Sequence, residues 1–201
     1  MAHLCRGPLA SRHPCHVTLK MRPDVPSLRD ARLVREVERS FACVLDRQDF
    51  RLVHDSIQSN HLHLIVEAKD VGALGRGMNA LGARLARAVN RVFGRKGRVL
   101  LERFHHVVLR TPTQVRNTLR YVLLNARRHL KKKPAITRID PASSGRWFEG
   151  WRHSAAGLVA QARERPGGSV MAIARPHTWL LAVGWRKAGP RLDPAEMPGA
   201  S

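Results

Sequence analysis

Two histidines placed two residues apart are the clearest chemical feature of this sequence. His61 and His63 lie in a mostly apolar run, SNHLHLIV, over residues 59–66. Side chains alternate between the two faces of a strand, so both imidazoles are predicted on one face and the intervening leucines on the other. Two neighbouring imidazole nitrogens suit a divalent metal ion. The alternative is a pair of half-exposed strand histidines that bond only to their neighbours.

The single tyrosine of the chain, Tyr121, is the candidate nucleophile, and Asn125 follows it by one helical turn. A deprotonated tyrosine oxygen can form a covalent intermediate. A metal ion on a phosphate oxygen neutralises charge and orients the phosphorus for in-line attack. Together with the histidines, Tyr121 predicts metal-assisted chemistry on a nucleic-acid backbone. The alternative is a boundary tyrosine, with its ring on the core and its hydroxyl in solvent.

The charge of the chain predicts an anionic partner. It has 36 Lys and Arg against 15 Asp and Glu, a formal net charge of +21 over 201 residues. Nucleic acid is the expected partner because Lys and Arg contacts to phosphate give sequence-independent affinity. A basic structural protein of the ribosome or nucleoid would carry the same charge. The residues predicted to contact DNA are Arg76, Arg84, Arg87, Arg91, Lys131, Lys132 and Lys133.

The pattern of apolar residues predicts an α+β fold. Strands are expected at 15–21, 50–57, 61–68 and about 98–110, with the middle two forming a hairpin. Helices are expected from Ser27 as N-cap to about residue 46, from Asp70 to about 93, and from a capping box at Thr111 to about 130. This order predicts a ferredoxin-like or RRM-like four-stranded, mostly antiparallel sheet with its helices packed on it, plus a C-terminal extension.

The remaining histidines and the cysteines receive no catalytic role. His16 and His54 are predicted to be structural, and His105 and His106, on opposite faces of their strand, to be structural or to contact DNA. The three cysteines are widely spaced, which predicts no disulfide and a reducing setting. With no apolar segment long enough to span a membrane, we expect a cytoplasmic, nucleoid-associated protein.

Residues 134–201 hold all four tryptophans and are predicted to form an extension that packs on the core or contacts DNA. Short helices are expected near 150–165 and 176–188. Tryptophans in such a segment more often anchor it to the core than bind a ligand. We therefore expect at least two of the four to attach the extension to the core.

The motifs around the histidines and the tyrosine resemble a known family. The run SNHLHLIV resembles the metal-binding motif of HUH-type single-tyrosine transposases, and LRYVLLNARRH at 119–129 looks like their catalytic helix. The strand at 15–21 and ERFHH at 102–106 are similar to the branch of REP-associated tyrosine transposases. The resemblance covers roughly residues 13–133 and implies that they form an HUH nuclease domain. The tail segments 140–144 and 147–151 also look like that branch.

This resemblance implies a site and a reaction. His61 and His63 would bind Mg²⁺ or Mn²⁺, with Asn125 as third ligand where the family often has glutamine, and with His129 as its competitor. Tyr121 would attack single-stranded DNA at hairpin-bearing repeats, giving a 5′-phosphotyrosine link and a free 3′-hydroxyl. The site would form within a monomer or, with exchanged helices, in a homodimer. The alternative function is a non-catalytic nucleic-acid-binding protein on the same fold.

Overall fold

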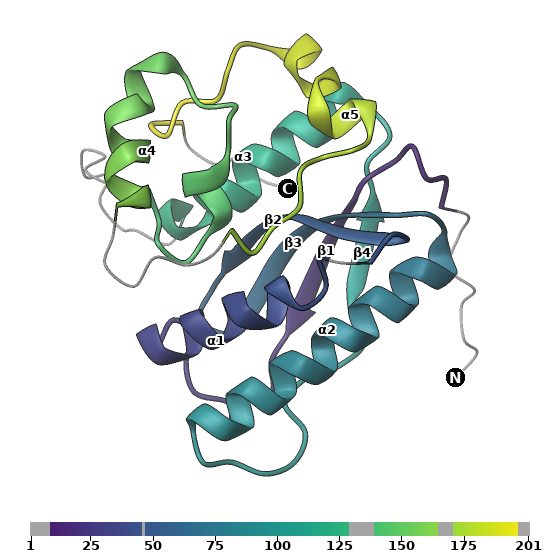
Figure 1. Cartoon of the computed structure of the whole chain (residues 1–201), viewed down its shortest axis with the longest axis vertical. Helices are drawn as coiled ribbons and strands as arrows, with labels where there is room; N and C mark the ends of the chain where they lie inside the picture. The colour runs from purple at the N-terminus through teal and green to yellow at the C-terminus, as the bar shows by residue number, and fades with distance from the viewer. Residues whose placement is uncertain (1–8, 46, 129–138, 165–170, 197–201) are drawn as a thin grey trace.

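The computed structural model describes residues 9–45, 47–128, 139–164 and 171–196. Its centre is one antiparallel sheet in the order β2-β3-β1-β4. The strands are β1 (Cys15–Lys20), β2 (Phe50–Ile57), β3 (His61–Ala68) and β4 (His105–Val108). Helices lie on both faces of the sheet (Figure 1). The predicted α+β class and four-stranded antiparallel sheet are therefore confirmed.

Strand alternation makes one face of the sheet mostly apolar. In β1 and β3, residues such as Val17 and Leu64 pair directly and lie in the larger core cluster. Their neighbours Thr18 and His63 also pair directly and therefore point to the opposite face. The polar side chains of the central strands are thus gathered on a single side of the sheet.

Two helices, α1 (Ala31–Ala42) and α2 (Val71–Val92), cover the apolar face. The predicted N-cap Ser27 is wrong for α1, because the cap is Asp30, whose carboxylate accepts the N–H groups of Arg32 and Leu33. The buried Leu28 explains the later start, since its N–H donates to the Ser59 carbonyl at 2.8 Å and holds this segment against the hairpin turn.

The opposite face carries α3 (Pro112–Arg128) and the C-terminal extension (Figure 1). The predicted capping box is confirmed at the start of α3: Gln114 Oε1 accepts the Thr111 N–H, and Thr111 Oγ1 accepts the Gln114 N–H. A second apolar cluster joins sheet, helix and extension, and its members include Ile65, Leu119, Val122, Trp151 and Trp185. Two tryptophans therefore anchor the extension, as predicted.

The extension is built from short elements. They are the 3₁₀ turns η1 (Ser144–Trp147), η2 (His153–Ala155) and η3 (Gly184–Ala188), and the helices α4 (Ala156–Arg163) and α5 (Trp179–Ala182). Polar contacts supplement the apolar anchors. Asp140 accepts two hydrogen bonds from the Arg29 guanidinium, and the Leu52 carbonyl accepts the Ala174 N–H at 2.7 Å.

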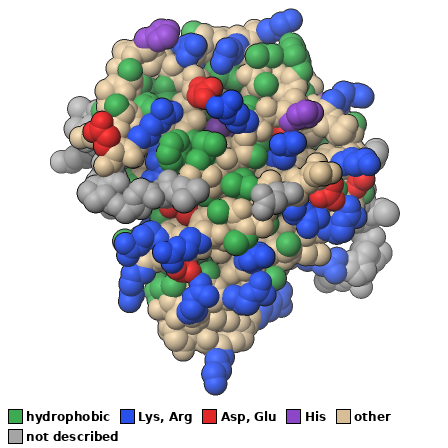
Figure 2. Space-filling view, viewed as in Figure 1, with side chains coloured by type: hydrophobic (Ala, Val, Ile, Leu, Met, Phe, Trp, Pro, Cys, Tyr) green, Lys and Arg blue, Asp and Glu red, His purple; other side chains and the backbone are tan. Residues whose placement is uncertain are grey.

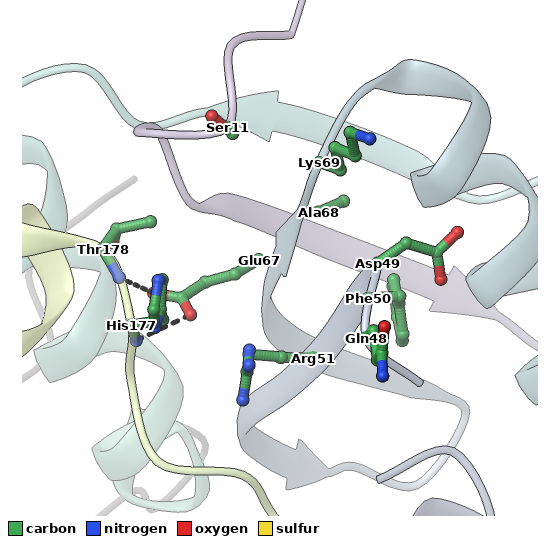
Figure 3. A pocket seen from close by; sticks show the side chains of 10 residues that line it. All are labelled: Ser11, Gln48, Asp49, Phe50, Arg51, Glu67, Ala68, Lys69, His177 and Thr178. Atoms are coloured by element: carbon green, nitrogen blue, oxygen red, sulfur yellow. Dashed lines mark hydrogen bonds between the residues drawn. The ribbon is translucent and has the colours of Figure 1, made fainter. Parts of the chain in front are cut away.

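A hollow of about 190 Å³ marks the seam between the end of β3 and the extension (Figure 3). Arg51, Glu67, Lys69 and His177 are among the side chains that line it. Both carboxylate oxygens of Glu67 are used, accepting the backbone N–H groups of His177 and Thr178 at 2.8 Å each. Glu67 therefore ties the start of α5 to the sheet.

The fourth strand is shorter than the sequence predicts. Only His105–Val108 pairs with β1, and the earlier part of the segment contributes an isolated bridge between Leu100 and Met21. At the bridge, the Arg98 guanidinium donates to the carbonyls of Leu100 and Leu101. Within the described ranges, no helix combines the length and the apolar character that a membrane span requires.

Candidate active site

His61 and His63 lie side by side on the face of the sheet that carries α3. Their Nε2 atoms are 3.0 Å apart, and their rings meet edge to face at 81°. His63 is buried, whereas His61 is half-buried. Asn60 Oδ1 lies 2.8 Å from His61 Nδ1. Because the Asn60 oxygen is an acceptor, it favours the tautomer of His61 with its proton on Nδ1. The lone pair of His61 Nε2 is then directed to the space that it shares with His63 Nε2.

Tyr121 reaches the same point from α3. Its hydroxyl oxygen is 3.3 Å from His63 Nε2, and the two rings pack edge to face with centroids 4.9 Å apart. The tyrosine is half-buried, with its ring against the second apolar cluster. The phenol and the imidazole pair therefore meet within one chain, although 58 residues separate Tyr121 from His63.

Asn125 lies one helical turn after Tyr121 and is almost completely buried, with 1% of its surface exposed. Its Oδ1 has no hydrogen-bond partner among the residues that the structure describes. A buried carbonyl oxygen without a donor is uncommon in folded proteins and requires an explanation. A bound cation or a water molecule would satisfy it. His129 and Lys131, Lys132 and Lys133 lie outside the described residues.

The spacing of the two Nε2 atoms fits a single divalent cation. Two ligand nitrogens at about 2.1 Å from one ion and at right angles to each other lie about 3.0 Å apart, and the two Nε2 atoms are separated by 3.0 Å. No group of three or more His, Cys, Asp and Glu side chains in the described parts of the chain could hold a metal ion. Within the described residues, a further protein ligand would therefore be of another type, such as an amide oxygen.

Two residues of β1 belong to this cluster and were not assigned to it from sequence. His16 Nε2 lies 3.2 Å from His63 Nδ1, and Thr18 Oγ1 lies 3.3 Å from the same nitrogen. His16 also packs edge-on against the Tyr121 ring, with centroids 5.8 Å apart. Burial, assisted by the nearby His105, lowers the pKa of His16 to about 4, so this imidazole is neutral at neutral pH.

The structure places His16 beside His63 and Tyr121, a position that the prediction of a structural role did not include. The sequence signal was the alternation of His16, Thr18 and Lys20 with apolar residues, which put the three on one face without showing what that face would meet. His54 behaves differently. Its Nδ1 is 3.3 Å from Ser144 Oγ, its ring packs against Phe148, and burial lowers its pKa to about 3.

The arginines of α2 lie across the sheet from Tyr121, because α2 packs on the opposite face. Arg76 forms an ion pair with Asp49 at 2.8 Å, and Arg91 forms one with Glu36. Arg84 and Arg87 are exposed. These side chains can contact only a part of a nucleic acid distant from the histidines.

A groove of about 280 Å³ between α1 and α2 adds further arginines to that face. The residues that line it include Arg32, Arg35, Arg39 and Arg91, with Glu36 among them. Figure 2 shows Lys and Arg side chains gathered over the lower part of the molecule, where Figure 1 places these two helices.

Comparison with solved structures defines the class of fold: the sheet and its helices are consistent with the HUH transposase fold. One matching structure is that of a REP-associated tyrosine transposase bound to a REP hairpin, at a TM-score of 0.55 and 16% sequence identity. The match covers 88% of this chain and 99% of that one. It is too long to be contained in residues 1–133, so it reaches into the extension. At this identity the likeness is one of fold. No family model and no curated protein matches this sequence.

Proposed function

We propose that this protein is a metal-dependent endonuclease and strand transferase that acts on single-stranded DNA, with Tyr121 as its nucleophile. The observation that supports this most is the meeting of the Tyr121 hydroxyl with His63 Nε2 at 3.3 Å, beside the second imidazole of His61. A phenol next to two imidazoles with converging Nε2 atoms is a nucleophile beside a pair of potential metal ligands. The likeness to a tyrosine transposase in fold supports the same proposal.

His61 and His63 are the residues that would hold Mg²⁺ or Mn²⁺, and Asn125 is the proposed third ligand. The unpartnered, buried Oδ1 of Asn125 supports its role, because a carbonyl oxygen is a ligand that both cations accept. When bound, such a cation would withdraw charge from the phosphate under attack. His129 stays an alternative third ligand that the described residues do not include.

The proposed step is a transesterification. The Tyr121 oxygen forms a bond to the scissile phosphorus, and the bond from phosphorus to the 3′ oxygen breaks. The phenol proton passes to solvent, and the departing 3′ oxygen takes a proton from solvent. The products are a 5′-phosphotyrosine and a free 3′-hydroxyl. Attack by another 3′-hydroxyl on the phosphotyrosine reverses the step and joins strands without ATP, since one ester simply replaces another.

The proposed substrate is single-stranded DNA that carries hairpin repeats. The structure of similar fold was solved with a REP hairpin bound, and this chain carries a net charge of +21. We propose that Arg84, Arg87 and Arg91 contact phosphates of the DNA away from the cleaved bond. Arg76 and Lys131–Lys133 are further proposed contacts. Because Tyr121 and both histidines meet within one chain, a monomer contains these three side chains of the site.

A covalent-adduct assay tests the proposal. The whole protein is incubated with Mn²⁺ and a hairpin-bearing single strand labelled at its 3′ end, because the 5′-phosphotyrosine retains the fragment 3′ of the cut. A labelled protein band on a denaturing gel is expected, and it should disappear with EDTA and in Tyr121→Phe. The chain has one tyrosine, so no other phenol can replace it.

The metal site is tested by His63→Ala in the same assay. This variant should lose the adduct while keeping most of its affinity for DNA, since phosphate contacts by arginine supply that affinity. Undiminished binding by the wild type, with no adduct for any hairpin tried, would instead identify a non-catalytic binding protein. Loss of folding together with binding in His63→Ala would identify a structural histidine.

A further inference from the structure

His63 is contacted at both ring nitrogens, and the contacts on the two sides differ in chemistry. Nε2 faces the groups of the proposed reaction, namely His61 Nε2 at 3.0 Å and the Tyr121 hydroxyl at 3.3 Å. Nδ1 faces β1, where His16 Nε2 lies at 3.2 Å and Thr18 Oγ1 at 3.3 Å. The register explains this placement, because Thr18 is the direct partner of His63 in the sheet and His16 lies two residues along β1.

A neutral imidazole carries its proton on one nitrogen, and only the other nitrogen can bind a metal ion. If Nε2 is to be a ligand, the proton must be on Nδ1, where it needs an acceptor. A threonine hydroxyl and an unprotonated histidine nitrogen both accept hydrogen bonds. His63 has 4% of its surface exposed, so water is a poor substitute for these acceptors.

We propose that Thr18 and His16 are positioning residues that hold His63 with its proton on Nδ1 and direct its Nε2 lone pair to the metal site. The inference rests on the proposed function. Asn60 gives a parallel case, since its Oδ1 lies 2.8 Å from His61 Nδ1 and sets that ring in the same way. Acceptors behind metal-binding histidines fix the tautomer and the ring orientation, and their loss weakens metal binding about 10–100-fold.

The two residues differ in what else they contact. The Thr18 hydroxyl contacts the His63 imidazole at one nitrogen, whereas the His16 ring also packs on the rings of His63 and Tyr121, with centroids 5.2 Å and 5.8 Å away. Loss of the Thr18 hydroxyl should therefore change only the tautomer and metal affinity. Loss of the whole His16 ring should also free the tyrosine that carries the nucleophile.

The first experiment reads the tautomer of His63 directly, with neither metal nor DNA present. Long-range ¹H–¹⁵N correlation spectra of the labelled full chain, in mildly alkaline buffer, distinguish a proton on Nδ1 from one on Nε2. The wild type is expected to carry it on Nδ1. In Thr18→Val combined with His16→Phe, which keeps an aromatic ring but removes both acceptors, a large population with the proton on Nε2 is expected.

The second experiment measures Mn²⁺ affinity by calorimetry without DNA. We expect Mn²⁺ to bind about 10–100-fold more weakly to the double variant than to the wild type. Thr18→Val alone should lose less affinity. His16→Gln should bind Mn²⁺ more tightly than His16→Phe, because its amide oxygen can accept a hydrogen bond. His106→Phe is the matched control, because His106 pairs with Val17 and so lies on the other face of the sheet. It should change neither the tautomer nor the affinity.

A wild-type His63 with its proton on Nε2 would overturn the proposal, as would a double variant with an unchanged tautomer and unchanged affinity. The single variants provide the same comparison if the double variant does not fold. Failure of the proposed function is a separate result. A wild type with the Nδ1 tautomer that shifts in the variants, but with no Tyr121–DNA adduct, would support the positioning role and refute the nuclease.

Discussion

Two glycines on α2, two residues apart, should respond to the same substitution with opposite signs. A Cβ built on Gly77 would lie 2.3, 2.4 and 2.8 Å from atoms of the Phe50 ring, whereas a Cβ on Gly75 would have no atom within 4 Å. Phe50 is completely buried on β2. Gly77 is therefore the point at which α2 approaches the sheet too closely for any side chain.

The expected magnitudes follow from this geometry. Alanine is favoured over glycine inside a helix by about 1 kcal/mol, so Gly75→Ala should raise the free energy of unfolding by up to that amount. In Gly77→Ala the same gain is opposed by a ring that must move by roughly 1 Å or more to reach ordinary carbon contact distances of about 3.5–4.0 Å. Overpacking of this kind costs about 1–3 kcal/mol and occasionally more, so a net loss is expected.

Thermal unfolding of the two variants beside the wild type measures the effect. For a chain of this length, 1 kcal/mol corresponds to roughly 2–4 °C in Tm. Gly75→Ala should unfold at the same temperature as the wild type or higher, and Gly77→Ala lower. Phe50→Leu added to Gly77→Ala should recover part of the loss that the clash causes. A Gly77→Ala variant at least as stable as Gly75→Ala would refute the close contact between α2 and β2.

Three further perturbations test the packing of the core and the extension. Burial raises the pKa of Asp55 from its ordinary value of 3.8 to about 8, with Glu38 adding to the shift. The folded protein therefore holds this proton more tightly than the unfolded chain does. The free energy of unfolding should fall as pH rises from about 4 to about 8, by at most about 6 kcal/mol. In Asp55→Asn, the urea midpoint of unfolding should change less with pH across that range. Trp185→Ala, at a side chain only 2% exposed, should cost about 3–5 kcal/mol by calorimetry, and an equal loss in Trp179→Ala, at 52% exposure, would contradict this. Glu67→Gln replaces a carboxylate that accepts two backbone N–H groups of the extension, so limited proteolysis should cut residues 171–178 sooner than in the wild type.

Local patterns were enough to predict much of this fold. Alternation put His61 and His63 on one face of a strand, and the capping box at Thr111 placed the start of α3, because each depends on the backbone period or on hydrogen bonds within a few residues. The same patterns misplaced the cap of α1 and overextended β4. The start of α1 depends on the contact of Leu28 with the distant Ser59 carbonyl. The length of β4 depends on how many of its residues pair with β1.

The sequence by itself determined the residue types of the candidate site, the strand and helix that carry them, and the cationic character of the chain. Only the tertiary structure decided that His16 and Thr18 lie behind His63, and that the α2 arginines lie across the sheet from Tyr121. The physical reason is that such placements depend on strand register and on which face each helix covers. These are set by packing between segments some 50 residues apart, and no local periodicity encodes them.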